Sequence, residues 1–191
     1  MIEYIYSAYS NSNSIIEICN KAISEFSGNI IEIGAGYGEM TSHFLDIAKA
    51  HNVKTIVIDP FEDGWDNMPE SYGKPYPFEK FMSNVHSKID YMVLQKVSSH
   101  SEGLYEKLQK DMPYSFAFVD GLQYEWAVIS DLTLMDKLNC KVICVDDYDR
   151  LNNVSSVPSA IDKFLEKNNN YELIVKSELK ERTKAFLIKN K

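Results

Sequence analysis

The fold of this chain is decided by the stretch Ile30-Ile31-Glu32-Ile33-Gly34-Ala35-Gly36-Tyr37-Gly38-Glu39. Four residues with the character of a buried strand run into three alternating glycines, and an amphipathic helical pattern follows over residues 40–50. A strand that turns sharply into a helix needs residues without a Cβ, because they adopt positive φ values and let a ligand lie against the backbone. The stretch predicts a ligand-binding β–α turn; the alternative is a purely structural turn in another α/β protein.

The spacing of the glycines separates two classes of ligand. Gly34, Gly36 and Gly38, with Glu32 two residues before the first of them, resemble motif I of the class I S-adenosylmethionine (SAM) dependent methyltransferases. The resemblance implies that the glycines let the methionine half of SAM approach the backbone and that Glu32 orients its ammonium group or the loop. A nicotinamide-binding loop reads Gly-x-Gly-x-x-Gly, and its last glycine is replaced here by Glu39, a poor neighbour for a pyrophosphate. A nicotinamide-dependent oxidoreductase is therefore the less favoured alternative.

Composition limits the classes of function. The chain has 191 residues, which we expect to form one domain over residues 1–191. A net charge of -8 argues against nucleic-acid binding, and no window approaches the ~20 apolar residues of a membrane span. The first residues lack the pattern of a signal peptide, and Cys19, Cys140 and Cys144 are an odd number without a second Cys or His pair. We expect reduced core thiols, a cytoplasmic location and no membrane attachment; the oligomeric state stays open, with a homodimer among the options.

Hydrophobic patterns along the chain predict alternating helices and strands. Helices are expected at residues 15–26, 40–50, 78–88, 103–110, 124–138 and 159–166, and strands at 30–33, 53–58, 91–95, 115–119, 141–145, 171–176 and 184–189. Residues 1–27 are an N-terminal helical segment with a lead-in or flap at 1–13, and residues 61–77 are interpreted as an active-site lid. The layout matches an α/β, Rossmann-like class I methyltransferase fold. Such a fold has a seven-stranded, mostly parallel sheet with a C-terminal antiparallel hairpin and helices on both faces.

Polar side chains follow the second and third expected strands. Asp59 ends the second strand, 25 residues after Gly34, where an acid can accept hydrogen bonds from a ribose. In the methyltransferases that the chain resembles, this position holds the ribose hydroxyls of SAM, and a Ser-Glu pair such as Ser101 and Glu102 lies beside the adenine. The alternatives are a turn-forming Asp before Pro60 and a helix cap at Ser101.

Three carboxylates follow the fourth and fifth strands, namely Asp120, Asp146 and Asp147. If these strands are neighbours, their ends lie about 5 Å apart, so the acids meet at one rim of the sheet. Carboxylates this close raise one another's pKa unless a cation joins them, and hard oxygen ligands favour Mg²⁺, with Ca²⁺ or Mn²⁺ as options. A metal there would chelate a substrate oxygen and lower the pKa of its hydroxyl. The alternative is that the acids cap the next helix or bond loop amides.

A narrower resemblance rests on two motifs, Phe118-Val119-Asp120-Gly121-x-x-Tyr124 with Asp131-Leu132, and Val145-Asp146-Asp147-Tyr148. Over about residues 30–166 the chain is similar to the metal-dependent O-methyltransferases of the macrocin and mycinamicin sugar-modifying type, and more distantly to the catechol O-methyltransferases. This resemblance implies a Mg²⁺ site built from the three aspartates, with Asp120 also beside SAM. It implies transfer of the SAM methyl group to a sugar or phenolic hydroxyl of a small-molecule acceptor.

One pair of positions departs from that pattern. In those relatives the second or third residue after the metal-binding Asp is a base, whereas this chain has Leu122 and Gln123, which take no proton at neutral pH. Asp149, His86 and His100 are the other candidates for a base. We predict a SAM-dependent O-methyltransferase assisted by a divalent metal. The alternatives are a metal-independent N- or O-methyltransferase and a SAM-binding module without catalysis.

Overall fold

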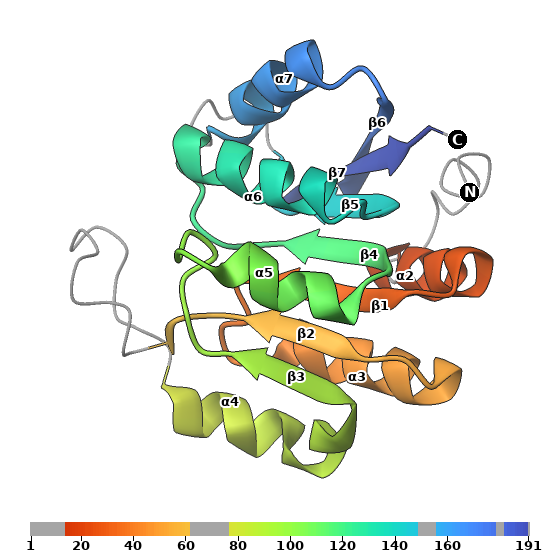
Figure 1. Cartoon of the computed structure of the whole chain (residues 1–191), viewed down its shortest axis with the longest axis vertical. Coiled ribbons are helices and arrows are strands. Elements are labelled where there is room, and N and C mark those ends of the chain that lie inside the picture. The colour runs from red at the N-terminus through yellow and green to blue at the C-terminus, as the bar shows by residue number, and fades with distance from the viewer. Residues whose placement is uncertain (1–13, 62–76, 149–155, 179–181, 191) are drawn as a thin grey trace.

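The structure is a computed structural model that describes residues 14–61, 77–148, 156–178 and 182–190. In this part of the chain seven strands form one sheet with the order β3-β2-β1-β4-β5-β7-β6 (Figure 1). The strands are β1 (Asn29–Ile33), β2 (Thr55–Ile58), β3 (Met92–Gln95), β4 (Tyr114–Val119), β5 (Val142–Val145), β6 (Tyr171–Glu178) and β7 (Arg182–Lys189). Strands β1 to β5 pair in parallel, while β7 lies between β5 and β6 and is antiparallel to both. The predicted mixed sheet with its C-terminal hairpin is confirmed.

Helices cover both faces of the sheet. They are α2 (Ser14–Phe26), α3 (Glu39–His51) and α4 (Phe78–Val85) on one side, and α5 (Leu104–Leu108), α6 (Glu125–Lys137) and α7 (Val157–Lys167) on the other, with short 3₁₀ turns η3 (His86–Tyr91) and η4 (Gln109–Asp111). Figure 1 shows α5 and α6 in front of the sheet and α2 and α3 behind it. None of the helices in the described ranges is long and apolar enough to cross a membrane.

Burial on both faces explains why the central strands read as continuous apolar runs. Successive side chains of a strand point to opposite faces, so Ile31 packs with the α5–α7 layer while Ile30 packs with Phe44 of α3. The Phe44 ring lies 5.8 Å from that of Phe116 and 5.7 Å from that of Phe118, between centroids. Glu32 occupies the same face as Ile30, which places a carboxyl group inside an apolar layer.

The thiols are part of this core, as the sequence predicts. Cys19, Cys140 and Cys144 are all reduced and buried. Burial raises the pKa of the Cys140 thiol to about 12, so this side chain stays a neutral hydrophobic group at physiological pH.

Two helix ends differ from the predicted chemistry. Helix α2 ends at Phe26, and Ser27 rather than a glycine takes the left-handed conformation (φ 52°) while its N–H donates to the carbonyl oxygen of Ile23 at 2.8 Å. Gly28 serves close packing instead, because a Cβ there would lie 2.7 Å from Oγ of Ser115. Helix α5 begins after Gly103 (φ 74°) without a side-chain cap, so the alternative of a cap at Ser101 is wrong.

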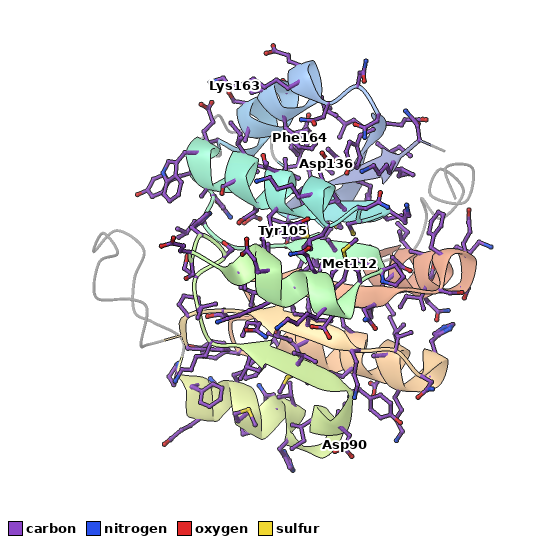
Figure 2. The ribbon with its side chains drawn as sticks, in the orientation of Figure 1. Asp90, Tyr105, Met112, Asp136, Lys163 and Phe164 are labelled. Atoms are coloured by element: carbon purple, nitrogen blue, oxygen red, sulfur yellow. The ribbon has the colours of Figure 1, made fainter. Side chains whose placement is uncertain are left out.

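The C-terminal hairpin is fixed to the helix layer beside it. Asp136 of α6 accepts hydrogen bonds from the hydroxyl of Tyr171 at 2.9 Å and from Nζ of Lys189 at 2.8 Å, and the rings of Phe164 and Tyr171 lie 5.6 Å apart (Figure 2). These contacts hold β6 and β7 against α6 and α7. Strand β7 thereby adds its own side chains to the edge where β5 ends.

Candidate functional site

The strand order reverses between β1 and β4, and the ends of these two strands frame the site. The N–H of Gly34 donates to the carbonyl oxygen of Ile58 at 3.0 Å, and the N–H of Asp120 donates to that of Ile33 at 2.8 Å. The arrowheads of β2, β3 and β4 point to the left in Figure 1, so this edge is the left side of the sheet there. Ligands of open α/β sheets bind at such a reversal, outside the carboxyl ends of the strands.

The glycine loop has the backbone that the sequence predicts. Gly34, Gly36 and Gly38 have φ values of 83°, 52° and 82°, all in the left-handed region. A Cβ on Gly34 would lie 2.2 Å from the carbonyl oxygen of Asp120, and one on Gly38 would lie 2.9 Å from the ring of Phe81. The loop is therefore pressed against β4 on one side and against α4 on the other, and larger residues do not fit.

Asp59 fastens the glycine loop to the end of β2. Its Oδ2 accepts hydrogen bonds from the N–H groups of Ala35 at 2.8 Å and Gly36 at 3.1 Å, and its Oδ1 accepts one from Phe61 at 2.7 Å. Its side chain is buried. The sequence predicted a ribose ligand or a turn former here. The bond from Phe61, two residues further on, forms such a turn, and the bonds from Ala35 and Gly36 add a third role, in which the carboxylate fixes the loop.

Glu32 lies beneath the loop with one oxygen bonded and one not. Its Oε2 accepts a hydrogen bond of 2.6 Å from the hydroxyl of Thr41, while its buried Oε1 has no hydrogen-bond partner among the described residues. Burial raises the pKa of Glu32 to about 8; the Thr41 bond lowers it, and the charges of Asp120 and Asp59 add to the rise. A buried carboxyl group with a spare oxygen is suited to receive a cation.

Helix α4 supports the loop from the side, a contact that the sequence analysis missed. Asn84 donates a hydrogen bond of 2.8 Å from Nδ2 to the carbonyl oxygen of Tyr37, and Nζ of Lys80 lies 4.1 Å above the Tyr37 ring. Nothing in the local sequence pattern indicates this contact, because Asn84 and Tyr37 are 47 positions apart in the chain. The lid predicted at residues 61–77 precedes α4, and its residues 62–76 lie outside the described part of the chain.

The turn after β3 carries Ser101 and Glu102, the residues predicted beside adenine. The N–H of Ser101 donates to the carbonyl oxygen of Ser98 at 3.0 Å, which folds the turn, and Glu102 is exposed. His100 in the same turn has Nε2 3.3 Å from Oδ1 of Asp131, a residue of α6 that is 1% exposed. The nearby carboxylate of Asp131 raises the pKa of His100 against the opposing effect of its partial burial. This pair ties the turn to α6.

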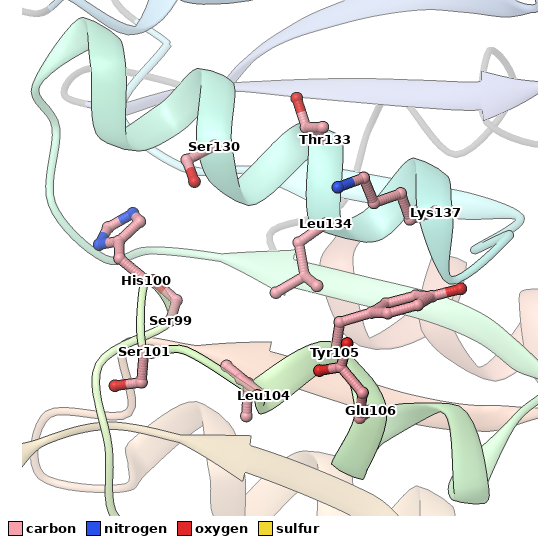
Figure 3. A pocket seen from close by; sticks show the side chains of 11 residues that line it. Ser99, His100, Ser101, Leu104, Tyr105, Glu106, Ser130, Thr133, Leu134 and Lys137 are labelled. Carbon is pink, nitrogen blue, oxygen red and sulfur yellow. The ribbon is translucent and has the colours of Figure 1, made fainter.

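A groove of about 490 Å³ runs between α5 and α6 (Figure 3). Ser99, His100 and Ser101 form one end of the groove, and Tyr105 and Lys137 lie at the other. The predicted adenine-side residues therefore border a recess, although most of its length follows the outer helix layer away from the glycine loop.

Two of the three aspartates of the predicted carboxylate rim bond to other groups of the protein. The N–H of Asp146 donates to the carbonyl oxygen of Val119 at 3.0 Å, so Asp120 and Asp146 follow neighbouring strand ends as expected. Oδ1 of Asp146 lies 3.4 Å from Nζ of Lys184 and accepts the N–H of Asp147 at 2.9 Å. In the described ranges no group of three or more His, Cys, Asp or Glu side chains is arranged to hold a metal ion.

Asp147 and the candidate bases that the structure describes contact other groups of the chain. Asp147 has a left-handed backbone (φ 55°), and its Oδ2 accepts a hydrogen bond from the amide of Gln123. Gln123 therefore has a structural contact at the position where relatives carry a base. Of the other candidate bases, His86 is exposed with Nδ1 2.9 Å from the carbonyl oxygen of Ser83, His100 is paired with Asp131, and Asp149 lies outside the described residues.

Comparison with known proteins identifies this architecture. No protein-family model matches the sequence, and no curated protein matches it closely enough to count as a relative. Solved structures do match. The TDP-rhamnose 3'-O-methyltransferase CalS11 of calicheamicin biosynthesis is 16% identical, with 91% of this chain and 77% of that chain covered at a TM-score of 0.63.

Two further structures are similar to the same extent. The O-methyltransferase NovP is 16% identical over 93% of this chain and 78% of its own, with a TM-score of 0.67. TomG from Streptomyces achromogenes, an O-methyltransferase of tomaymycin synthesis solved in complex with SAM, is 12% identical over 96% of this chain and 82% of its own, with a TM-score of 0.62. The chain therefore has the fold of the class I SAM-dependent O-methyltransferases.

Proposed function

We propose that this chain is a SAM-dependent methyltransferase that methylates a hydroxyl group of a small molecule, a sugar or a phenol. The observation that carries the proposal is Glu32, a buried carboxyl group beneath the glycine loop whose Oε1 has no hydrogen-bond partner among the described residues. A polar atom left in this state costs free energy unless a ligand satisfies it. The ammonium group of SAM is a ligand of the required charge.

The other predicted SAM contacts are compatible with this reading. The glycine loop has the left-handed backbone that lets a ligand lie against it, and Asp59 holds two of its N–H groups in place. The carboxylate of Asp59 lies at the end of β2 beside the glycine loop, where we propose that it also accepts a hydrogen bond from a ribose hydroxyl. The turn with Ser101 and Glu102 borders the adenine side in this proposal.

Chemistry at the site rests on alignment rather than on a strong base. SAM supplies, when bound, a methyl group already activated by its sulfonium charge. The chain's part is to hold the acceptor oxygen in line with that methyl group and to exclude bulk water. Leu122 and Gln123 take no proton, so we propose that the hydroxyl proton leaves to water as the new O–C bond forms and the S–C bond breaks.

The acceptor class is proposed from the similar structures. CalS11 is described as acting on TDP-rhamnose at its 3' oxygen, and TomG and NovP as O-methyltransferases. These descriptions share methyl transfer to an oxygen, and the first of them names a sugar. The proposal of a sugar or phenolic hydroxyl adds what the motif resemblance around Asp120 and Asp146 implies. The N-methylation alternative has no observation of its own to favour it.

The sequence also predicted that a divalent metal assists the reaction, and the described residues do not fit a metal site. Asp146 faces an ammonium group and Asp147 faces an amide, so two of the three expected ligands are bonded to protein. We therefore propose that methyl transfer proceeds without a metal.

The proposal is tested by following S-adenosylhomocysteine (SAH) release with SAM and a panel of nucleotide sugars, simple glycosides and phenols. We expect release with at least one hydroxylated acceptor and unchanged rates in EDTA. Tight SAH binding without turnover on any acceptor would instead identify a SAM-binding module. Binding of NADH without SAH would contradict the whole proposal.

A further inference from the structure

A buried lysine lies where the carboxylate rim needs a positive charge. Lys184 comes from β7, and its side chain is 8% exposed. Its Nζ lies 3.4 Å from Oδ1 of Asp146, whose side chain is 6% exposed and which directly follows β5. Two charged groups that are both buried almost completely are tolerated in a protein only when they are paired.

The backbone around this pair encloses it. Strands β5 and β7 are antiparallel, with Val145 opposite Ala185. This register brings Asp146, which directly follows β5, level with Lys184 of β7. Beyond the pair, where the regular ladder has ended, the N–H of Tyr148 donates to the carbonyl oxygen of Thr183 at 2.6 Å. Asp146 and Lys184 are thus positioned by main-chain contacts on both sides, and their approach does not depend on flexible surface side chains.

We infer that the ammonium group of Lys184 is the resident cation of this rim and takes the place of the divalent metal that the family resemblance implies. The chemistry of the two cations differs in a useful way. A divalent ion needs several oxygen ligands at once, whereas an ammonium group needs one carboxylate and a few acceptors. Asp146 supplies that carboxylate, and Asp147 is turned to Gln123 instead.

The inference rests on the proposed function and deepens it, because it names the group that faces Asp146 at the rim of a methyl-transfer site without a metal. Lys184 is a positioning residue, because it acts through Asp146 at the end of β5. The ion pair itself can be tested without any acceptor, so its failure and the failure of the proposed function give different results.

The first test measures metal binding. Electron paramagnetic resonance of aqueous Mn²⁺ reports the free ion, whose signal falls when protein binds it. We compare the wild-type chain with Asp146→Asn, which keeps the shape of the side chain and removes its charge. Equal amounts of bound Mn²⁺ in the two proteins are expected. More Mn²⁺ on the wild type than on Asp146→Asn would overturn the inference, because it would make Asp146 a metal ligand.

The second test is a double-mutant cycle in thermal unfolding with Lys184→Met and Asp146→Asn. Each single change leaves one buried partner without its counter-charge and should lower the Tm by about 10 °C. The double variant should lose clearly less than the sum of the two, because neither charge is left behind. Additive losses would overturn the inference. Lys184→Arg, which preserves the charge, should stay closest to the wild-type Tm even if Lys184→Met fails to fold.

Lys189 provides a matched control on the same strand. It pairs with Asp136 rather than with Asp146, at 2.8 Å and with greater exposure. Lys189→Met combined with Asp146→Asn should therefore give additive changes in Tm. SAH affinity of the wild-type chain, measured by calorimetry in Mg²⁺ and in EDTA, separates the two proposals. If the wild type binds no SAH, the proposed function is wrong, but the coupling between Lys184 and Asp146 in the unfolding experiment still holds or fails by itself.

Discussion

The hydroxyl of Thr41 donates a 2.6 Å hydrogen bond to Oε2 of Glu32, and in the described structure this is the bond that holds the carboxyl group beneath the glycine loop. Burial is the main reason that the pKa of Glu32 rises from 4.5 to about 8. The free chain therefore carries a neutral glutamic acid at the base of its ligand site over much of the physiological pH range. Any cation that binds there has to compete with a proton.

Stability of the ligand-free chain should fall as pH rises through this window. The folded state keeps the Glu32 proton above pH 4.5, where the unfolded state has lost it, so folding binds a proton and is opposed by rising pH up to about 8. At its steepest the slope is about 1.4 kcal/mol per pH unit. Urea unfolding of the wild type and of Glu32→Gln at several pH values between about 5 and 8 measures it. Glu32→Gln should remove most of the pH dependence of the free energy of unfolding. Parallel profiles for the two proteins would contradict a raised pKa of Glu32.

Loss of the Asp59 carboxylate should loosen the glycine loop and weaken cofactor binding. In Asp59→Ala the N–H groups of Ala35 and Gly36 lose their acceptor, and the proposed ribose contact is lost as well. SAH affinity should drop tenfold or more, about 1.4 kcal/mol. Asp90→Ala serves as the control, since Asp90 is an exposed acid before β3 (Figure 2). Unchanged SAH affinity in Asp59→Ala would refute the role of Asp59.

Two glycines with the same backbone conformation should respond differently to alanine. Gly34 (φ 83°) has no room for a Cβ, which would lie 2.2 Å from the carbonyl oxygen of Asp120, whereas Gly103 (φ 74°) faces open space. Gly103→Ala should cost only the left-handed conformation, about 1 kcal/mol. Gly34→Ala should also force β1 and β4 apart and cost roughly 3 kcal/mol or more. Chemical denaturation measures both, and equal losses would show that the close approach is not real.

The His100–Asp131 pair should add a second pH dependence. The nearby carboxylate of Asp131 raises the folded-state pKa of His100 above 6.5, so the stability that this pair provides is fully present below pH 6.5 and is lost as pH rises through the higher folded value. Asp131→Asn should flatten this part of the profile. Nuclear magnetic resonance titration of the His100 ring checks the cause directly: a pKa at or below 6.5 in the wild type would be the contrary result.

Periodicity and glycine spacing were enough to predict the sheet and the loop. The strands at residues 30–33 and 53–58 are apolar because helices cover both faces, and that burial is visible in sequence as an unbroken apolar run. Gly34, Gly36 and Gly38 signal positive φ values because other residues avoid them. The neighbourhood of Asp120 and Asp146 followed from topology, since successive parallel strands end at one edge.

The partners of the charged residues were not predictable in the same way. Lys184 reads as an ordinary polar residue of a hairpin strand, and its pairing with Asp146 depends on β7 inserting beside β5. Asp59 has the position of a ribose ligand, but its backbone contacts arise from the exact path of the loop. Side-chain partners of this kind are set by tertiary packing, to which local patterns are blind. The predicted metal site is not supported for the same reason, because the partners of Asp146 and Asp147 are set by tertiary packing.

Calorimetric titration with SAH tests the central claim, that the nucleoside which SAM and SAH share binds at the reversal between β1 and β4 with its ammonium group on Glu32. Titrations are run in EDTA near pH 7, in two buffers with different ionisation enthalpies. The account predicts that one SAH binds per chain, that the binding enthalpy depends on the buffer because Glu32 releases its proton, and that Glu32→Gln abolishes this dependence. Absence of SAH binding, with NADH bound in its place, would contradict the account.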